Sequence, residues 1–206
     1  MSSKDLSATA GRIAQLALNH FADRGYDAAS MNDIAVLAGL KKASLYAHFE
    51  SKDALYTTAL AMALESEIGY VRTHFAHGEE DSDVPGEGYW SQLRDRYKQN
   101  DSLRFLLRAA FYPPHTLRKT VMLGYDGYLE VLRGCFTAAC VSGRQSISLE
   151  VESWLIDAYM AVIDSLTVEL IYGNDSGYCR RIEAFRGLYR HVHLIGQGLL
   201  ATSPKR

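Results

Sequence analysis

The sequence predicts an all-α protein, and three observations lead to this class. Ala and Leu, which favour helices, total 49 of the 206 residues, whereas the β-branched Val, Ile and Thr total 28. The four prolines lie at 85, 113, 114 and 204, so residues 1–84 and 115–203 contain none. No segment alternates apolar and polar residues convincingly with a period of two. We therefore expect about nine helices and no sheet.

The composition is that of an ordinary globular protein. Hydrophobic residues make up 48% and charged residues 22%, and the net charge of −2 gives no general attraction for nucleic acid. The longest stretch without charge, residues 191–204, is too short and too polar to span a bilayer. The three cysteines match no metal or redox spacing. We expect a cytoplasmic protein with no membrane association, no metal site and no cofactor.

The first helix is expected over residues 7–24. Ile13, Ala17 and Phe21 recur at every fourth position and form one apolar stripe facing a core. Gly25 follows the last turn, where a left-handed residue can close a helix without steric cost.

Residues 30–49 predict a short helix, a glycine-centred turn and a second short helix. Ser30 can cap the first of these helices, and Asp33 sits three residues later, as in a capping box. Gly39 turns the chain, and Leu45 fills the gap between the two helices. This order is the helix-turn-helix pattern of DNA-binding proteins.

Helical spacing continues along the rest of the chain, interrupted by an acidic loop at 79–86. The further helices are expected at about 51–75, 88–98, 101–111, 115–141, 149–172 and 178–201. The last two are apolar on more than one side, so each must bury more than one side. One side can face the protein's own core, and the other requires a second chain or a ligand cavity.

Residues 10–56 resemble the TetR/AcrR family of bacterial transcriptional regulators. The resemblance is carried by Ile13, Ala17, Phe21, Gly25, Tyr26, Ile34-Ala35, Ala38-Gly39, the stretch Leu45-Tyr46-Ala47-His48-Phe49 and the stretch Ser51-Lys52-Asp53-Ala54-Leu55. The sequence departs from the family at Lys41, where a serine or threonine usually caps the recognition helix.

The resemblance implies a homodimer with two parts. The head, residues 1–50, would read double-stranded operator DNA. The body, residues 51–206, would dimerise through its last two helices and bind a small effector.

The exposed side of the second short helix supplies the predicted DNA contacts. By analogy with the family, Ser30, Tyr46 and Lys52 contact phosphate groups. Base edges are expected to meet Lys42, Ser44 and His48, and Ala43 can touch a thymine methyl group. Lys41 lies on the same surface, where we expect it to be a solvated charge. Alternatively, Tyr46 is an aromatic residue at the edge of the core, and His48 has no contact with DNA.

Two further sets of residues are predicted for the body. The effector pocket is expected to draw on an aromatic set with one acid: Trp90, Tyr97, Phe105, Phe111, Tyr112, Met122, Tyr125, Asp126, Trp154 and Tyr159. Most of these could equally be ordinary core. The dimer interface is expected at Trp154, Ala158, Ala161, Ser165, Leu166, Val168, Ile182, Phe185, Tyr189 and Val192.

These features predict a ligand-responsive transcriptional regulator, most often a repressor in this family. The predicted repressor leaves its operator when a small amphipathic or aromatic effector binds. The alternative is a DNA-binding regulator whose body contacts a protein partner. No phosphate-binding loop, nucleophile elbow or paired acids are evident in the sequence, so we do not predict an enzyme.

Overall fold

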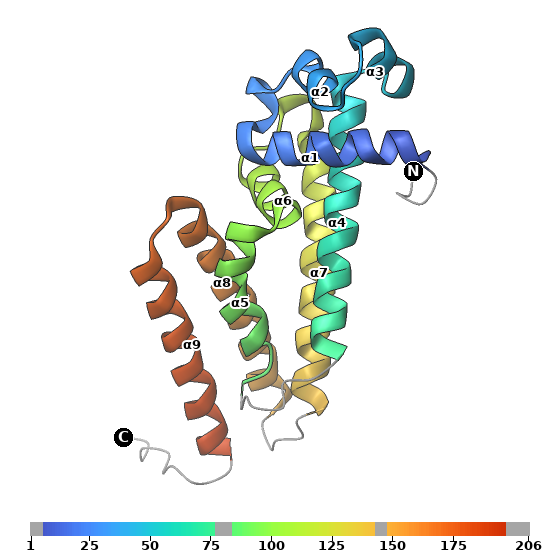
Figure 1. Cartoon of the computed structure of the whole chain (residues 1–206). Coiled ribbons are helices and arrows are strands. Elements are labelled where there is room, and N and C mark those ends of the chain that lie inside the picture. Colours follow the sequence, from blue (N-terminus) through green and yellow to red (C-terminus); the bar gives the residue numbers. More distant parts are fainter. Residues whose placement is uncertain (1–5, 77–83, 143–147, 197–206) are drawn as a thin grey trace. The chain divides into compact units, whose positions relative to one another are not determined.

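The computed structural model describes residues 6–76, 84–142 and 148–196, and all regular elements in these ranges are helices (Figure 1). They are α1 (Ala8–Ala28), α2 (Met31–Leu37), α3 (Lys42–His48), α4 (Lys52–Ala76), α5 (Glu87–Gln99), α6 (Asp101–Phe111), a 3₁₀ turn (His115–Leu117), α7 (Arg118–Ser142), α8 (Leu149–Tyr172) and α9 (Asp175–Gly196). The predicted all-α class is confirmed for this part of the chain. Within it, no helix is long and apolar enough to cross a membrane.

Helix boundaries follow the prediction within a few residues, with clear differences in α1 and α9. The first helix was expected to end at residue 24, whereas α1 continues to Ala28 beyond a non-helical residue at Gly25. Helix α9 begins at Asp175 and not at residue 178, because the side chain of Asn174 accepts a hydrogen bond from the N–H of Gly177 at 3.1 Å. The predicted end of the helix at residue 201 lies outside the described residues, as does most of the predicted loop at 79–86.

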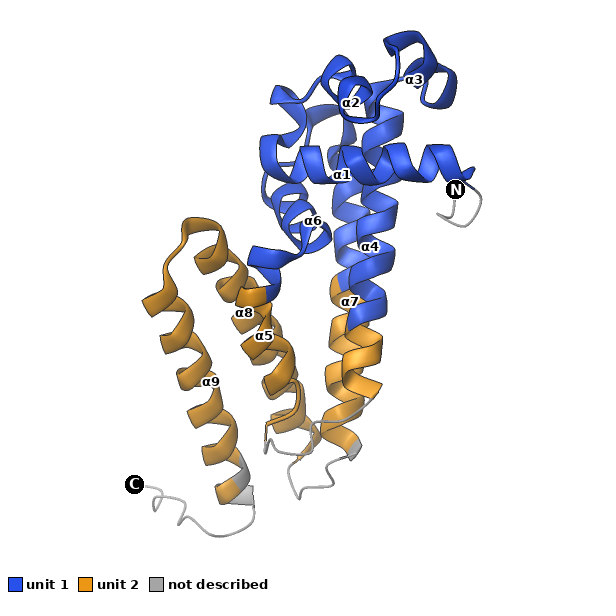
Figure 2. Cartoon of the chain, viewed as in Figure 1, with its two compact units in different colours: residues 1–70, 96–128 blue, residues 71–95, 129–206 orange. Residues whose placement is uncertain are grey.

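The chain forms two compact units, which Figure 2 distinguishes by colour. Unit 1 consists of residues 1–70 and 96–128, and unit 2 of residues 71–95 and 129–206. The division falls within α4, α5 and α7. The predicted boundary at residue 50 separates a DNA-reading segment from the rest, whereas the compact units follow packing, so unit 1 holds more than the predicted head.

The core of unit 1 is built on the apolar stripe of α1. Ile13, Ala17 and Phe21 are fully buried, as the periodicity predicts. The ring of Phe21 meets that of Tyr56 from α4, and Tyr56 meets Phe105 from α6, with 5.0 Å between centroids in both pairs. Aromatic pairs at this spacing add to the stabilisation from buried area. Helix α6 packs along α1, and α1 in turn contacts α2.

The core of unit 2 is aromatic as well. The rings of Phe136 and Tyr159 are stacked with centroids 3.8 Å apart, and Trp90 meets Phe185 edge-on at 5.0 Å. The hydroxyl of Tyr178 donates to the backbone carbonyl of Trp90. Helices α8 and α9 pack against each other around these side chains.

A buried ion pair links α4 to the end of α5 within unit 1. The Arg96 guanidinium donates from Nη2 to Oε2 of Glu67 at 2.7 Å, and it lies 3.3 Å from the centroid of the Tyr70 ring. Glu67 is fully buried, and this burial raises the pKa of its carboxyl group while the charge of Arg96 lowers it. The carboxylate therefore depends on Arg96 to remain charged.

Replacing Arg96 with leucine should lower the free energy of unfolding at pH 7 by about 3–5 kcal/mol, because a buried carboxylate would lose its counter-charge. This loss in the free energy of unfolding should be smaller at acidic pH. A raised pKa means that the folded state holds a proton which the unfolded state has released, so stability falls as pH rises from the ordinary glutamate pKa through the raised one. Urea unfolding across this range measures the effect.

The matched control for this experiment is the double substitution Glu67→Gln with Arg96→Leu. It removes the titrating group, so its stability should depend less on pH than that of Arg96→Leu alone. An equal loss at every pH in the single variant would contradict the assigned role of Arg96.

Candidate nucleic-acid interface

The turn between α2 and α3 is fixed by the backbone. Gly39 has φ +68°, in the left-handed region that favours glycine. The N–H of Leu40 donates to the carbonyl of Ala35 at 2.8 Å, and that of Gly39 donates to Val36 at 3.0 Å. These two bonds form a Schellman motif, which pairs carbonyls that the end of α2 would otherwise leave free. The angle between α2 and α3 therefore depends on Gly39.

Side chains fix both ends of α2. The Ser30 hydroxyl accepts from the N–H of Asp33 at 3.1 Å and donates to its carboxylate at 2.7 Å, so the predicted cap is present. At the other end, Arg12 Nη2 donates to the carbonyl of Ala38 at 3.1 Å. Arg12 could not be identified from the sequence, because its partner is a backbone atom 26 residues away.

Helix α3 presents one continuous exposed face. Leu45 is fully buried and Phe49 almost so, which seats the helix on the core. The exposed residues are Lys41, Lys42, Ala43, Ser44, Tyr46, Ala47 and His48. Tyr46 keeps 42% of its surface exposed, so it lies on this face, and Lys42 Nζ is 5.9 Å from the centroid of its ring. The structure thus brings together the predicted base-reading and phosphate-binding side chains of α3.

The start of α3 lacks a side-chain cap because Lys41 stands there. The residue occupies the N-cap position, and its side chain makes no capping hydrogen bond. A serine or threonine there would stabilise the helix by about 1 kcal/mol, so α3 depends more on the burial of Leu45.

Lys52 has a different environment from the one expected. Its ammonium donates to the backbone carbonyls of Tyr26 at 2.9 Å and Ala29 at 3.1 Å, and it lies 4.0 Å from the centroid of the Tyr26 ring. The ammonium group is half-buried. Its hydrogen bonds connect the segment between α1 and α2 to the start of α4. The predicted phosphate contact would have to share this cation with the two carbonyls.

Tyr26 completes this link. Its hydroxyl donates to the carboxylate of Asp53, and burial together with that carboxylate raises the pKa of Tyr26 to about 12. The phenol therefore stays protonated at neutral pH. Sequence reasoning placed Tyr26 in the family signature without giving it a role, and the structure shows it as a hydrogen-bond donor.

The predicted effector residues are divided between the two compact units, and two of them, Phe105 and Tyr112, line a cavity in unit 1. Phe105 and Tyr125 are buried in unit 1, and Trp90 and Tyr159 are buried in unit 2. Of the others, Tyr97 and Met122 are partly buried, and Phe111, Tyr112, Asp126 and Trp154 are exposed.

The predicted dimer residues divide into two groups. Leu166, Ile182, Phe185 and Tyr189 are buried within unit 2, so they do not lie on an outer face of α8 or α9. The reason is that these positions occupy the sides along which α8 and α9 meet the core. The remaining six are partly buried or exposed: Trp154, Ala158, Ala161, Ser165, Val168 and Val192.

Together, the short helices, their Schellman turn and the exposed face of α3 define a helix-turn-helix protein. Comparison with known proteins agrees with this class. Residues 13–59 match the family described as bacterial regulatory proteins, tetR family. The match covers the helix-turn-helix segment and not the rest of the chain.

Two curated relatives each match part of the chain. The biofilm operon icaADBC negative transcriptional regulator IcaR of Staphylococcus aureus is 44% identical over 45 residues, which cover 22% of this chain and 24% of that protein. The transcriptional activator FasR of Mycolicibacterium smegmatis is 42% identical over 62 residues, covering 30% of this chain and 28% of that one. The matches thus span only about a quarter of the length of these relatives.

The fold is similar beyond this region. The crystal structure of a TetR family transcriptional regulator from Agrobacterium tumefaciens covers 90% of this chain and 98% of its own, with a TM-score of 0.63 and 16% identity. At this identity the likeness concerns the fold alone.

Proposed function

We propose that this chain is a cytoplasmic transcriptional repressor that binds double-stranded operator DNA as a homodimer. The observation that carries the proposal is the outer face of α3, where Lys42, Ser44 and His48 are exposed while Leu45 is fully buried. A helix held in this way fits the major groove, and its side chains can reach base edges. Two such helices would read half-sites one helical turn apart, about 34–36 Å centre to centre.

The phosphate groups are contacted from the flanks of α3. Tyr46 offers a hydroxyl on the exposed face. Ser30 lies at the start of α2, and its hydroxyl would turn from Asp33 to donate to a phosphate. The cations are Lys41, Lys42 and Lys52, which compensate for a chain whose net charge is −2. Repression is proposed by analogy with IcaR, which is a negative transcriptional regulator.

The test starts from duplexes selected from a random pool. Lys42→Ala should reduce discrimination between the selected and unrelated sequences by about 1–3 kcal/mol, because a base contact is lost. Tyr46→Phe should weaken binding to both kinds of sequence similarly, because a phosphate contact carries no sequence information. Fluorescence anisotropy at two salt concentrations measures both.

Lys98→Ala is the control for charge, since Lys98 is an exposed lysine of α5 and lies outside the helix-turn-helix segment. Its affinity should match that of the unsubstituted protein. If Lys42→Ala and Tyr46→Phe both bind like the unsubstituted protein, α3 is not the reading helix.

The homodimer forms through the outer faces of α8 and α9. Trp154 and Leu188 are 61% and 47% exposed, although both are large apolar side chains, and Ala161 lies on the exposed side of α8. A helix that is apolar on two sides and buries only one of them within its own unit leaves a surface for a second copy.

Ala161→Glu and Leu188→Glu should each shift the protein to a monomer in sedimentation velocity, because a charge would be buried at the interface. Both positions are exposed in the single chain, so neither substitution should unfold unit 2. The control is Leu123→Glu on α7, where the leucine is 76% exposed and lies in unit 1. A dimer that survives both substitutions would place the interface elsewhere.

A small effector releases the operator. Support comes from Trp90 in unit 2: its indole N–H is buried, and no described residue accepts its hydrogen bond. Buried donors are normally paired, so an acceptor group of a small amphipathic or aromatic molecule can supply the missing partner. Release requires that the effector bind one conformation of the dimer more tightly than the other.

Native mass spectrometry of the isolated protein should show a retained small molecule, and Trp90→Phe should reduce the retained fraction because the donor is removed. Tyr172→Phe is the control, because it changes an exposed aromatic side chain of unit 2 that belongs to neither the predicted effector residues nor the predicted dimer residues. Unfolding and refolding the isolated protein would release a bound effector. If the mass and the operator affinity of the protein are the same before and after this treatment, no effector was bound.

A further inference from the structure

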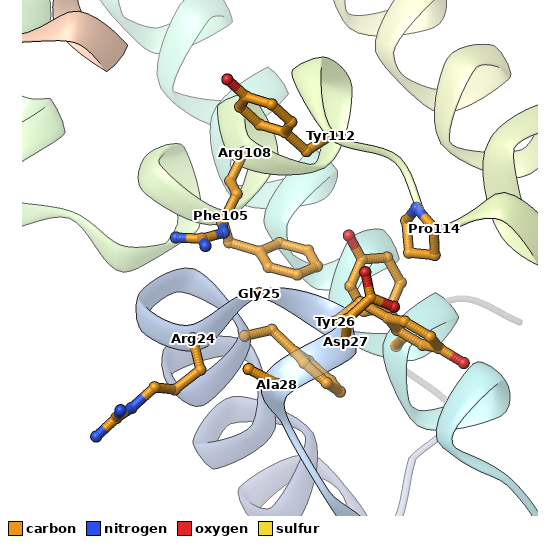
Figure 3. A pocket seen from close by; sticks show the side chains of 11 residues that line it. Arg24, Gly25, Tyr26, Asp27, Ala28, Phe105, Arg108, Tyr112 and Pro114 are labelled. Carbon is orange, nitrogen blue, oxygen red and sulfur yellow. The ribbon is translucent and has the colours of Figure 1, made fainter.

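Unit 1 contains a cavity of about 260 Å³ beside the end of α1 (Figure 3). Its floor is aromatic, because Phe21, Tyr56 and Phe105 line it and are almost fully buried. Their rings already pack in pairs at 5.0 Å. A flat ring entering the cavity would therefore meet other rings, an arrangement that aromatic groups favour.

A cation borders the same cavity. Arg108, from α6, is an exposed residue whose side chain lines the cavity beside Gly25. Its guanidinium can lie there because Gly25 has no side chain: a Cβ atom at that position would be 3.0 Å from Nε. The glycine thus has a second role besides its φ of +76°.

Arg108 is only weakly held by the protein. Its Nη1 donates to the backbone carbonyls of Ala22 at 3.4 Å and Asp23 at 3.3 Å, both long for such bonds. No described residue accepts a hydrogen bond from its Nε or Nη2. The guanidinium therefore retains the paired donors that bind a carboxylate.

Other charges around the cavity restrict what it can hold. In Figure 3, Asp27 lies across the aromatic rings from Arg108, and Arg24 points away from them. A second negative charge on a ligand would meet Asp27, so one carboxylate is favoured over two. The volume lies below the 300–1,000 Å³ of typical ligand pockets, which suits a single-ring molecule.

We propose that this cavity binds a small aromatic monocarboxylate, with its ring on Phe21, Tyr56 and Phe105 and its carboxylate on Arg108. The proposal goes beyond operator binding and does not depend on it, because the site lies within unit 1 and needs neither DNA nor a dimer. A bound carboxylate competes with the carbonyls of Ala22 and Asp23 for Arg108, so occupancy loosens the polar contact between α6 and α1.

Calorimetric titration with three probes of one shape tests the chemistry in the unsubstituted full chain. Benzoate should bind at least ten-fold more tightly than neutral benzamide and cationic benzylamine, because only benzoate pairs with the guanidinium. Equal affinities for the three, or no binding of benzoate at millimolar concentration, would overturn the proposal. This arm requires no variant and is unaffected by whether the protein binds an operator.

Two arginine variants locate the site. Arg108→Gln should weaken benzoate binding about ten-fold or more. Arg104→Gln should leave it unchanged, since Arg104 sits one turn earlier on α6, pairs with Asp23 and Asp101, and does not line the cavity. Urea unfolding of both variants checks that they remain folded. Unchanged affinity in a folded Arg108→Gln protein would place benzoate elsewhere and overturn the proposal.

Discussion

Burial of Leu45 is the interaction on which the reading surface depends. Helices α2 and α3 have seven residues each, too few to persist in isolation. Leu45 holds α3 against the core, the Schellman turn at Gly39 sets its angle to α2, and Arg12 binds the carbonyl before that turn. Because the apolar side is fully used for attachment, the polar side remains free to meet a partner.

Much of this arrangement could be predicted from the sequence, because it rests on local patterns. The stripe of Ile13, Ala17 and Phe21, the cap at Ser30 and the turn at Gly39 each depend on residues a few positions apart. Local patterns also distinguish Leu45, which is buried, from the exposed residues of α3. The all-α class followed from the same reasoning.

Contacts between distant residues could not be predicted in this way. Lys52 and Arg108 bind backbone carbonyls, and every residue type has a carbonyl, so no sequence pattern identifies the partner. The dimer residues show another limit. Periodicity detects two apolar sides on a helix without indicating which side the protein itself covers, so Phe185 was assigned to an interface although it belongs to the core. A missing donor–acceptor pair, such as that at Trp90, appears only once neighbours are known.

The break in α1 at Gly25 has a mechanical consequence. It interrupts the helix and leaves carbonyls near its end without helical partners; Lys52 from α4 and Arg108 from α6 then bind several of them. Hydrogen bonds from charged donors contribute about 1.5–3 kcal/mol each, and less where the donor is exposed, as Arg108 is. The direction of the chain after Gly25 therefore depends on side chains from α4 and α6 and not on the helical hydrogen bonds of α1 alone.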